Sequence, residues 1–154
     1  MRSSGEALRE VKNGNIDSVY FLLGSDYYLQ NLIINEISKV IFNDIKEDKT
    51  FLLPDDMKSE DIIDKITQSD LFSTKKLLVL RNPGNLRNKA RSDFLSYCKN
   101  PMSNICLIII EDEFSDRKSI TKELKKINNT VSVQTPFPSE MKKWTRFMLS
   151  EKQQ

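Results

Sequence analysis

The chain has 154 residues, which is enough for one domain with a hydrophobic core. Hydrophobic residues make up 38% and charged residues 30%, with four glycines and five prolines, so the composition excludes a disordered or low-complexity polymer. The chain has no histidine and two cysteines outside any CxxC spacing, which argues against a zinc site and a histidine-dependent catalytic triad. We expect Cys98 and Cys106 to be small buried hydrophobic residues.

No apolar run approaches the roughly 20 residues that a membrane-spanning helix needs. The first residues lack the apolar stretch of a secretory signal. We therefore expect a cytoplasmic protein without a membrane partner. The net charge of +2 argues neither for nor against nucleic acid, although basic residues concentrate in the second half of the chain and acidic ones in the first.

The first predicted element is a helix that Ser3 or Ser4 caps and that ends at Asn13-Gly14. Residues 19–23 then form a continuous β-prone apolar run, typical of a parallel strand covered on both faces. A helix follows from about Asp26, because apolar residues recur there at three- and four-residue spacing.

The same alternation continues along the chain. Strands are predicted near residues 50–53, 77–80, 105–110 and 131–133, and helices near 59–66, 87–99 and 116–127. This pattern predicts an α/β fold with a doubly wound, mostly parallel five-stranded sheet and flanking helices. We expect this domain to cover residues 1–140. An amphipathic helix over 141–154 either starts a helical linker or second domain, in which case the chain is a fragment, or packs on the sheet.

The loop after the first strand is where a doubly wound sheet normally binds phosphate. With Gly24 as the first glycine of G-x-x-x-x-G-K-[ST], the second glycine, the lysine and the hydroxyl positions hold Leu29, Gln30 and Asn31. Three of the four defined positions therefore do not match the motif. Ser25 and Asp26 are typical of a helix cap. The degenerate nucleotide loop thus comprises Gly24, Ser25, Asp26, Leu29, Gln30 and Asn31.

The remaining signals for catalysis are also weak. The strand at 77–80 ends in Arg81, which would repel the magnesium ion that a nucleotide hydrolase needs. Glu111 and Asp112 follow the strand at 105–110, but no phosphate loop accompanies them. We expect no catalytic residue, metal or cofactor. A nucleotide hydrolase with an atypical loop, built on Gly24 and the Glu111-Asp112 pair, is the alternative from a different class.

Four segments together carry a family resemblance. The first covers residues 69–82 and consists of Ser-Asp-Leu-Phe-Ser-Thr-Lys-Lys and the strand that follows it. The second is the strand and loop at 19–29. The third is Asp-Arg-Lys at 116–118 with Leu-Lys-Lys at 124–126, and the fourth is Met-Lys-Lys-Trp at 141–144. In this order the chain resembles the delta subunit of the bacterial DNA polymerase III clamp loader. The resemblance implies an N-terminal domain with the fold of the clamp-loader ATPases (AAA+ type) and without ATPase activity.

The resemblance also implies a clamp-binding site just before the strand at 77–80. There Leu71 and Phe72 would form a hydrophobic plug that enters a pocket of the beta sliding clamp, and Lys75 and Lys76 could meet acids at its rim. Ser69 stands where the family usually has an apolar residue. Two adjacent apolar side chains seldom both point into one core, so we expect at least one to be exposed. The alternative is that Leu71 closes the core and Phe72 covers the helix end.

The resemblance implies a role in DNA replication. The domain would bind and open the sliding clamp without hydrolysing ATP, beside the gamma/tau and delta prime subunits, and would meet DNA indirectly through the assembly. It would have no activity of its own within a holoenzyme that is a DNA-directed DNA polymerase. A stand-alone DNA-binding domain is a further alternative, with the lysines at 118, 122, 125 and 126 as its basic helix, although a solvated helix face explains these lysines better.

Overall fold

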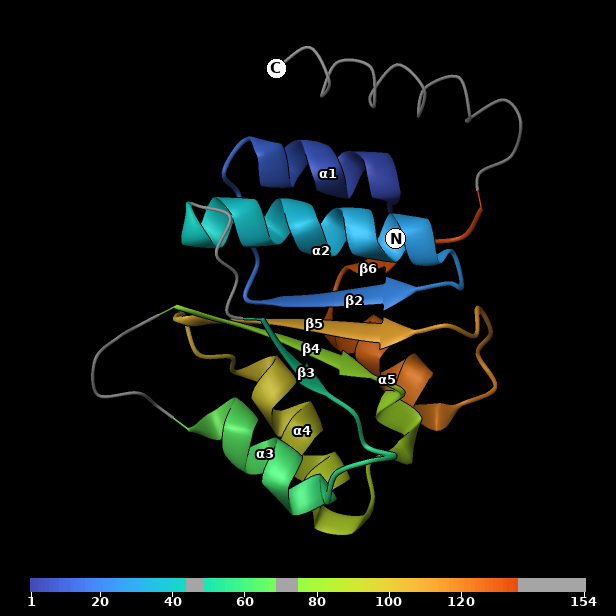
Figure 1. The fold of residues 1–154 in the computed structure, drawn as a ribbon. Coiled ribbons are helices and arrows are strands. Elements are labelled where there is room, and N and C mark those ends of the chain that lie inside the picture. Colours follow the sequence, from blue (N-terminus) through green and yellow to red (C-terminus); the bar gives the residue numbers. More distant parts are fainter. Residues whose placement is uncertain (44–48, 69–74, 136–154) are drawn as a thin grey trace.

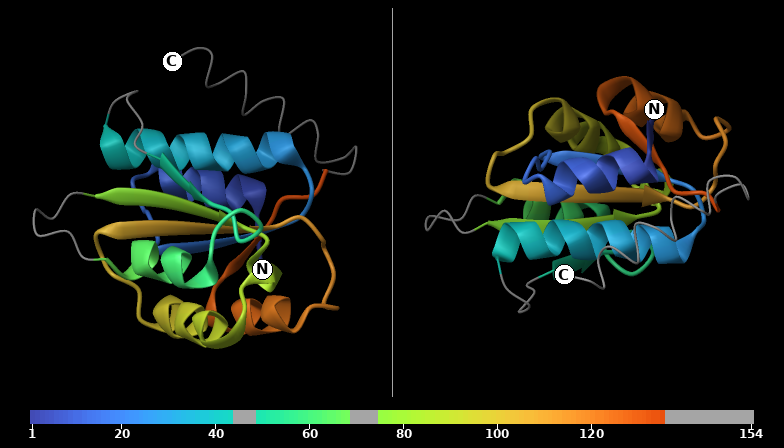
Figure 2. Two further views of the ribbon diagram at one scale, coloured as in Figure 1. Left: turned by 60° about the horizontal axis from the view of Figure 1, so that its bottom comes forward. Right: turned by 90° about the horizontal axis from the view of Figure 1, so that it is seen from above.

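The computed structural model describes residues 1–43, 49–68 and 75–135, and it shows a sheet between two layers of helices (Figure 1). One face carries α1 (Ser4–Lys12) and α2 (Tyr27–Phe42). The other face carries α3 (Ser59–Thr67), α4 (Asn88–Lys99) and α5 (Ser119–Ile127), which lie along the sheet in Figure 2. The predicted α/β architecture with helices on both faces is confirmed.

The sheet has six strands, where the sequence predicted five. They are β1 (Arg2–Ser3), β2 (Val19–Leu23), β3 (Lys49–Leu52), β4 (Lys76–Arg81), β5 (Ile105–Glu111) and β6 (Thr130–Ser132), in the order β1-β6-β2-β5-β4-β3. Each neighbouring pair in the described sheet is parallel. The prediction missed β1 because two residues are too few to show a periodicity.

Tertiary contacts hold β1 at the edge of the sheet. Arg2 is buried, and its guanidinium bonds to the carboxylates of Glu10 at 2.5 Å and Asp17 at 2.9 Å. It also lies 5.6 Å from the centre of the Tyr20 ring. Burial opposes charge on Arg2, but the two carboxylates outweigh it and raise the pKa of the guanidinium.

The central strands are buried on both faces, as their continuous apolar sequences predict. Every residue of β2 and β5 is buried. Alternate residues enter two separate hydrophobic clusters: Phe21 and Leu23 pack towards α3, α4 and α5, while Tyr20 and Leu22 pack towards α1 and α2. Two cores therefore hold the central strands in place from opposite sides.

Helix caps set the predicted helix starts with small shifts. Ser3, rather than Ser4, caps α1, since its hydroxyl accepts from the Glu6 N–H at 3.1 Å. Asp26 caps α2 as predicted, and its carboxylate accepts from the Leu29 N–H at 3.1 Å. The helix predicted from residue 116 begins at Ser119. A short 3-10 helix, Pro83–Asn85, occupies the turn after β4.

Parallel strands bring all their carboxyl ends to one edge of the sheet and all their amino ends to the other. The carboxyl edge lies to the right in Figure 1 and carries the loop after β2, whereas β4 begins at the amino edge. Across the described residues no helix is long and apolar enough to cross a membrane. The domain boundary predicted at residues 140–141 and the helix predicted after it lie outside the described residues.

Candidate functional site

The loop after β2 is packed against the chain that follows β6. Gly24 has φ +138°, and a Cβ atom there would lie 2.5 Å from the backbone carbon and oxygen of Val133. The Val133 N–H donates to the Leu23 carbonyl at 2.9 Å, and the Val133 carbonyl accepts from the Asp26 N–H at 3.0 Å. A glycine is required here by its backbone angle and by the close passage of another segment of the protein.

Gln30, at the lysine position of the phosphate loop, lies inside the protein. Its side chain is fully buried, and its amide nitrogen donates to the Gly24 carbonyl at 2.7 Å and to the Asp112 carboxylate at 2.9 Å. Its amide oxygen accepts from the Arg81 guanidinium at 2.9 Å. Both amide hydrogens and the oxygen of Gln30 thus have partners within the protein.

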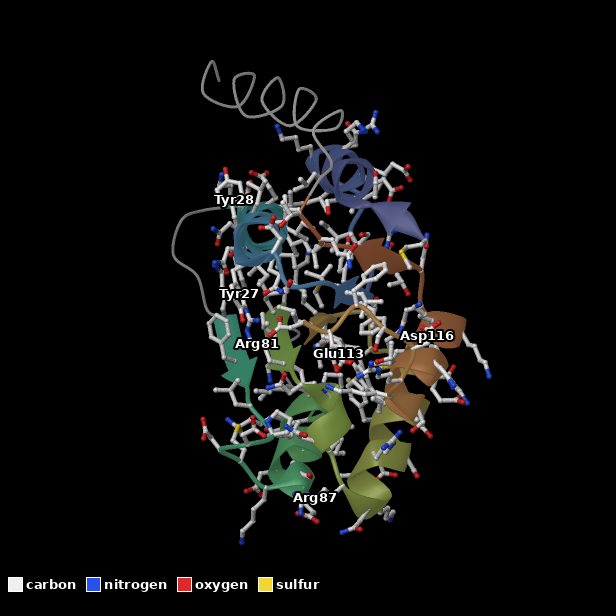
Figure 3. The ribbon with its side chains drawn as sticks, turned by 90° about the vertical axis from the view of Figure 1, so that its right-hand side faces the viewer. Tyr27, Tyr28, Arg81, Arg87, Glu113 and Asp116 are labelled. Carbon is white, nitrogen blue, oxygen red and sulfur yellow. The ribbon has the colours of Figure 1, made fainter. Side chains whose placement is uncertain are left out.

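Arg81 connects this network to the end of β4. Its guanidinium lies 3.7 Å from the Asp112 carboxylate and 5.9 Å from the centre of the Tyr27 ring. Figure 3 looks onto the carboxyl edge and shows Tyr27 beside Arg81, between α2 and β4. The network therefore ties α2, β4 and the loop after β5 together, with Gln30 buried and with Arg81 and Asp112 partly exposed.

The backbone of the loop is also engaged within the protein. The Gly24 N–H donates to the Glu111 carbonyl at 2.9 Å, and the Gln30 N–H donates to the Asp26 carbonyl at 3.0 Å. The N–H groups of Asp26 and Leu29 donate to Val133 and to Asp26, as described above. A phosphate loop needs such amides to point at the ligand. These four N–H groups donate to acceptors within the protein instead.

The acid at the end of β5 binds a lysine. Glu111 is buried, and its carboxylate bonds to the Lys118 ammonium at 2.8 Å and accepts from the Glu113 N–H at 3.2 Å. The hydrogen bond to Glu111 is the main reason that the pKa of Lys118 is raised. Among the described residues no group of three or more His, Cys, Asp or Glu side chains is placed to hold a metal ion.

The start of β4 lies at the other edge of the sheet. Lys75 is exposed and Lys76, the first residue of β4, is half-buried. The Lys76 N–H donates to the Asn104 carbonyl at 3.0 Å, where the turn before β5 meets β4. Ser69, Leu71 and Phe72 lie outside the described residues. Of the predicted clamp-binding residues, Lys75 and Lys76 are therefore described, and they lie at the opposite end of β4 from Arg81.

The family model for the DNA polymerase III delta subunit matches residues 20–134, which is more than half of the chain. The chain belongs to this family. No curated protein sequence matches the chain significantly.

Two solved structures share the fold of this delta family chain. The Bacillus subtilis DNA clamp loader delta protein (YqeN) matches with a TM-score of 0.76 and 17% sequence identity, over 98% of this chain and 48% of that one. A Thermotoga maritima DNA polymerase III gamma subunit-related protein matches with a TM-score of 0.55 and 15% identity, over 90% of this chain and 47% of that one. The chain thus spans about half the length of each.

The structure brings together only part of the degenerate loop of this delta family chain. Gly24, Asp26 and Gln30 share the interactions described above, Leu29 is buried in the core beneath α2, and Ser25 and Asn31 are exposed. Sequence reasoning missed that Gln30 and Arg81 are partners. The available signal was a polar residue at the lysine position together with a cation at the end of β4.

The lysines of the predicted basic helix lie on or beside α5, and both cysteines are buried. Lys125 bonds to Asp116 at 2.7 Å, and this bond is the main cause of the lowered pKa of Asp116. Lys122 is exposed on α5. Burial raises the pKa of both thiols, Cys98 and Cys106, to about 12, so they stay neutral as expected of buried hydrophobic residues.

Proposed function

We propose that this domain binds the beta sliding clamp through Leu71 and Phe72 and opens its ring without hydrolysing ATP. The observation that carries the proposal is the match to the delta subunit family over residues 20–134. The self-contained loop at the carboxyl edge supports it, because the groups that would hold a triphosphate bond to one another. The proposal includes a cytoplasmic assembly with the gamma/tau and delta prime subunits. In that assembly the domain would contact DNA only indirectly, through the other components of the complex.

Ring opening in this proposal requires no chemistry on the part of the domain. A ligand shifts a conformational equilibrium by the difference in its affinity for the two states. A domain that binds the open ring more tightly than the closed ring therefore favours opening. Any ATP hydrolysis would be left to partner subunits.

The experiment measures clamp affinity for the Leu71→Ala/Phe72→Ala double variant. Truncation of apolar anchors of this kind removes about 2 kcal/mol or more, so affinity should fall by roughly 30-fold or more. Phe114→Ala is the matched control, because Phe114 is an exposed phenylalanine in the loop after β5, at the carboxyl edge. Circular dichroism and thermal unfolding check that each variant is folded. Unchanged affinity in a folded double variant would remove Leu71 and Phe72 from the site.

Clamp opening needs a separate readout. A pair of fluorophores across one interface of the clamp should separate when the wild-type domain is added, and should separate less with the double variant. Binding without any change in the fluorophore distance would retain the docking role and contradict the opening role.

A further inference from the structure

The strand β3 lies at one outer edge of the sheet, where Figure 3 shows it (teal) beyond β4 and below α2. All four of its residues pair with β4, from Lys49 opposite Leu77 to Leu52 opposite Leu80. No strand of the described chain pairs with its other side. A strand directs the backbone N–H and C=O groups of alternate residues to each side, so β3 presents such groups outwards. An edge of this kind binds an extended backbone by adding a further strand.

Phe51, near the middle of β3, exposes an apolar side chain beside this edge. Leu52 is fully buried in the cluster with α3 and α4. Lys49 instead reaches the opposite layer, where its ammonium donates to the side-chain oxygen of Asn35 on α2 at 2.8 Å. Because side chains alternate along a strand, Phe51 lies on the α2 side with Lys49. Phe51 is 53% exposed, so an apolar group placed next to it would remove its ring from water.

Charges of opposite sign lie at the two ends of β3. Lys49 begins the strand, and Lys75 and Lys76 lie at the same end, because β4 begins there. The stretch that follows the strand carries a net negative charge, from Asp55, Asp56, Glu60 and Asp61 against Lys58. A second β3 running antiparallel to the first would place its basic end beside this acidic end, and its acidic end beside this basic end. A second copy of the strand therefore complements β3 in charge.

We propose that β3 is a self-association surface, where two copies of this chain pair their β3 strands antiparallel about a two-fold axis. A two-fold interface is self-complementary, which matches the opposite charges at the two ends of the strand. Residues directly opposite each other in an antiparallel pair lie on the same face of the sheet. The register centred on the exposed ring places Phe51 opposite Phe51 of the second copy, and Thr50 opposite Leu52 of the second copy. The inference goes beyond the proposed function and does not depend on it.

The pairing joins the two sheets into one continuous sheet, with both α2 helices on the same face. The contact is short, because β3 has four residues. Interfaces that bury less than about 1,200 Å² in total are typical of weak, transient complexes. We therefore expect a reversible dimer with a dissociation constant on the order of 100 μM.

The first test is sedimentation equilibrium of the whole chain at concentrations from about 10 μM to 1 mM. Phe51→Lys puts two like charges directly opposite each other and should raise the dissociation constant about tenfold or more. Phe114→Lys is the matched control, because Phe114 is also an exposed phenylalanine but lies in the loop after β5. It should leave the dissociation constant within about twofold of the wild type. Circular dichroism checks that both variants are folded.

Two outcomes of this test would overturn the inference. Equal dimerisation by folded Phe51→Lys and Phe114→Lys would place the interface elsewhere on the molecule. A wild-type chain that stays monomeric at about 1 mM would exclude a second copy as the partner of β3, and would leave the edge to an extended segment of another protein.

The second test examines the register. Opposite residues of an antiparallel pair have Cα atoms about 4.5–5.5 Å apart, which is within the range of a disulfide. Phe51→Cys should therefore form a cross-linked dimer under mild oxidation several times faster than Phe114→Cys. Cys98 and Cys106 should not interfere, because burial raises the pKa of both thiols to about 12. Equal rates of cross-linking for the two variants would contradict the pairing of β3 with β3.

Discussion

The two edges of the sheet differ in how their polar groups are used. At the carboxyl edge Gln30, Arg81 and Asp112 bond to one another, and the backbone of Val133 lies against Gly24. At the amino edge the backbone of Lys76 is held by Asn104, while the Lys75 side chain faces solvent. Ligands of open α/β sheets normally bind at the carboxyl edge. In this protein that edge is closed by its own residues.

A doubly wound sheet can therefore have a loop at its usual ligand position whose polar groups bond to one another within the protein. The loop at Gly24 still joins β2 to a capped helix, and its glycine is still required, but for contact with Val133. The side chains of Gln30, Arg81 and Asp112 now connect α2 to β4 and to the loop after β5. Substitutions at four positions test this contrast between the two edges of the sheet.

Gly24→Ala should have the largest effect on stability. Its Cβ would lie 2.5 Å from backbone atoms of Val133, which cannot move aside as a flexible side chain can, and φ is +138°. We expect a loss of about 3–5 kcal/mol in the free energy of unfolding, measured by urea denaturation. Gly14→Ala is the control, since Gly14 has φ +87° with no atom within 4 Å. It should cost about 1 kcal/mol. Equal losses would show that contact with Val133 contributes little.

Gln30→Lys tests whether the closed edge can be reopened to nucleotide. The ammonium would be buried beside the Arg81 guanidinium, and Arg81 would lose its acceptor. We expect a loss of about 2–4 kcal/mol in the free energy of unfolding. Isothermal titration should detect no magnesium-dependent ATP binding, in the variant or in the wild type. Saturable binding to the wild type would instead favour the nucleotide hydrolase. Asn31→Thr, at the next and exposed position of α2, should change stability by less than about 0.5 kcal/mol.

Lys118→Met should have an intermediate, pH-dependent effect. Removing the ammonium leaves the buried Glu111 carboxylate without its cation, which we expect to cost about 1–3 kcal/mol at neutral pH. The pKa of Lys118 is raised in the folded state, so its contribution is complete below the unfolded pKa of 10.5 and is lost as the pH rises through the folded pKa. The stability difference between wild type and variant should therefore narrow at pH values above about 10.5. A constant difference up to pH 12 would contradict this role.

Local sequence patterns predicted the central strands of the sheet. They did not predict the edge strand β1, and they placed the start of α5 less accurately. The apolar runs of β2, β4 and β5 need no tertiary context, because strands buried on both faces are continuous in sequence. β1 depends on pairing with β6 near the other end of the described chain, where Arg2 is in register with Val131. The start of α5 at Ser119 was harder to predict, because the side chain of Lys118 at the N-cap position makes no capping hydrogen bond.

The loop at Gly24 shows what a motif can and cannot predict about a site. Comparison with G-x-x-x-x-G-K-[ST] correctly showed that the lysine was missing. It could not show what replaced it, because Gln30 acquires its partners from β4 and from the loop after β5, far along the chain. The clamp-binding assignment of Leu71 and Phe72 came from family resemblance and stays a prediction.

The smallest expected effect concerns the open amino edge. Lys75→Ala should leave the free energy of unfolding within about 0.5 kcal/mol of the wild type, because the side chain is exposed and precedes β4. If Lys75 faces acids at the rim of the clamp pocket, the variant should associate more slowly with the clamp at low salt, while dissociation changes little. The difference should shrink as salt shortens the range of the charge interaction to about 8 Å at physiological ionic strength. Lys89→Ala, on the first turn of α4 at the carboxyl edge, removes the same charge from an exposed site and should not alter the association rate. Equal slowing by the two variants would indicate a general effect of net charge, and the amino edge would then have no special part in meeting the clamp.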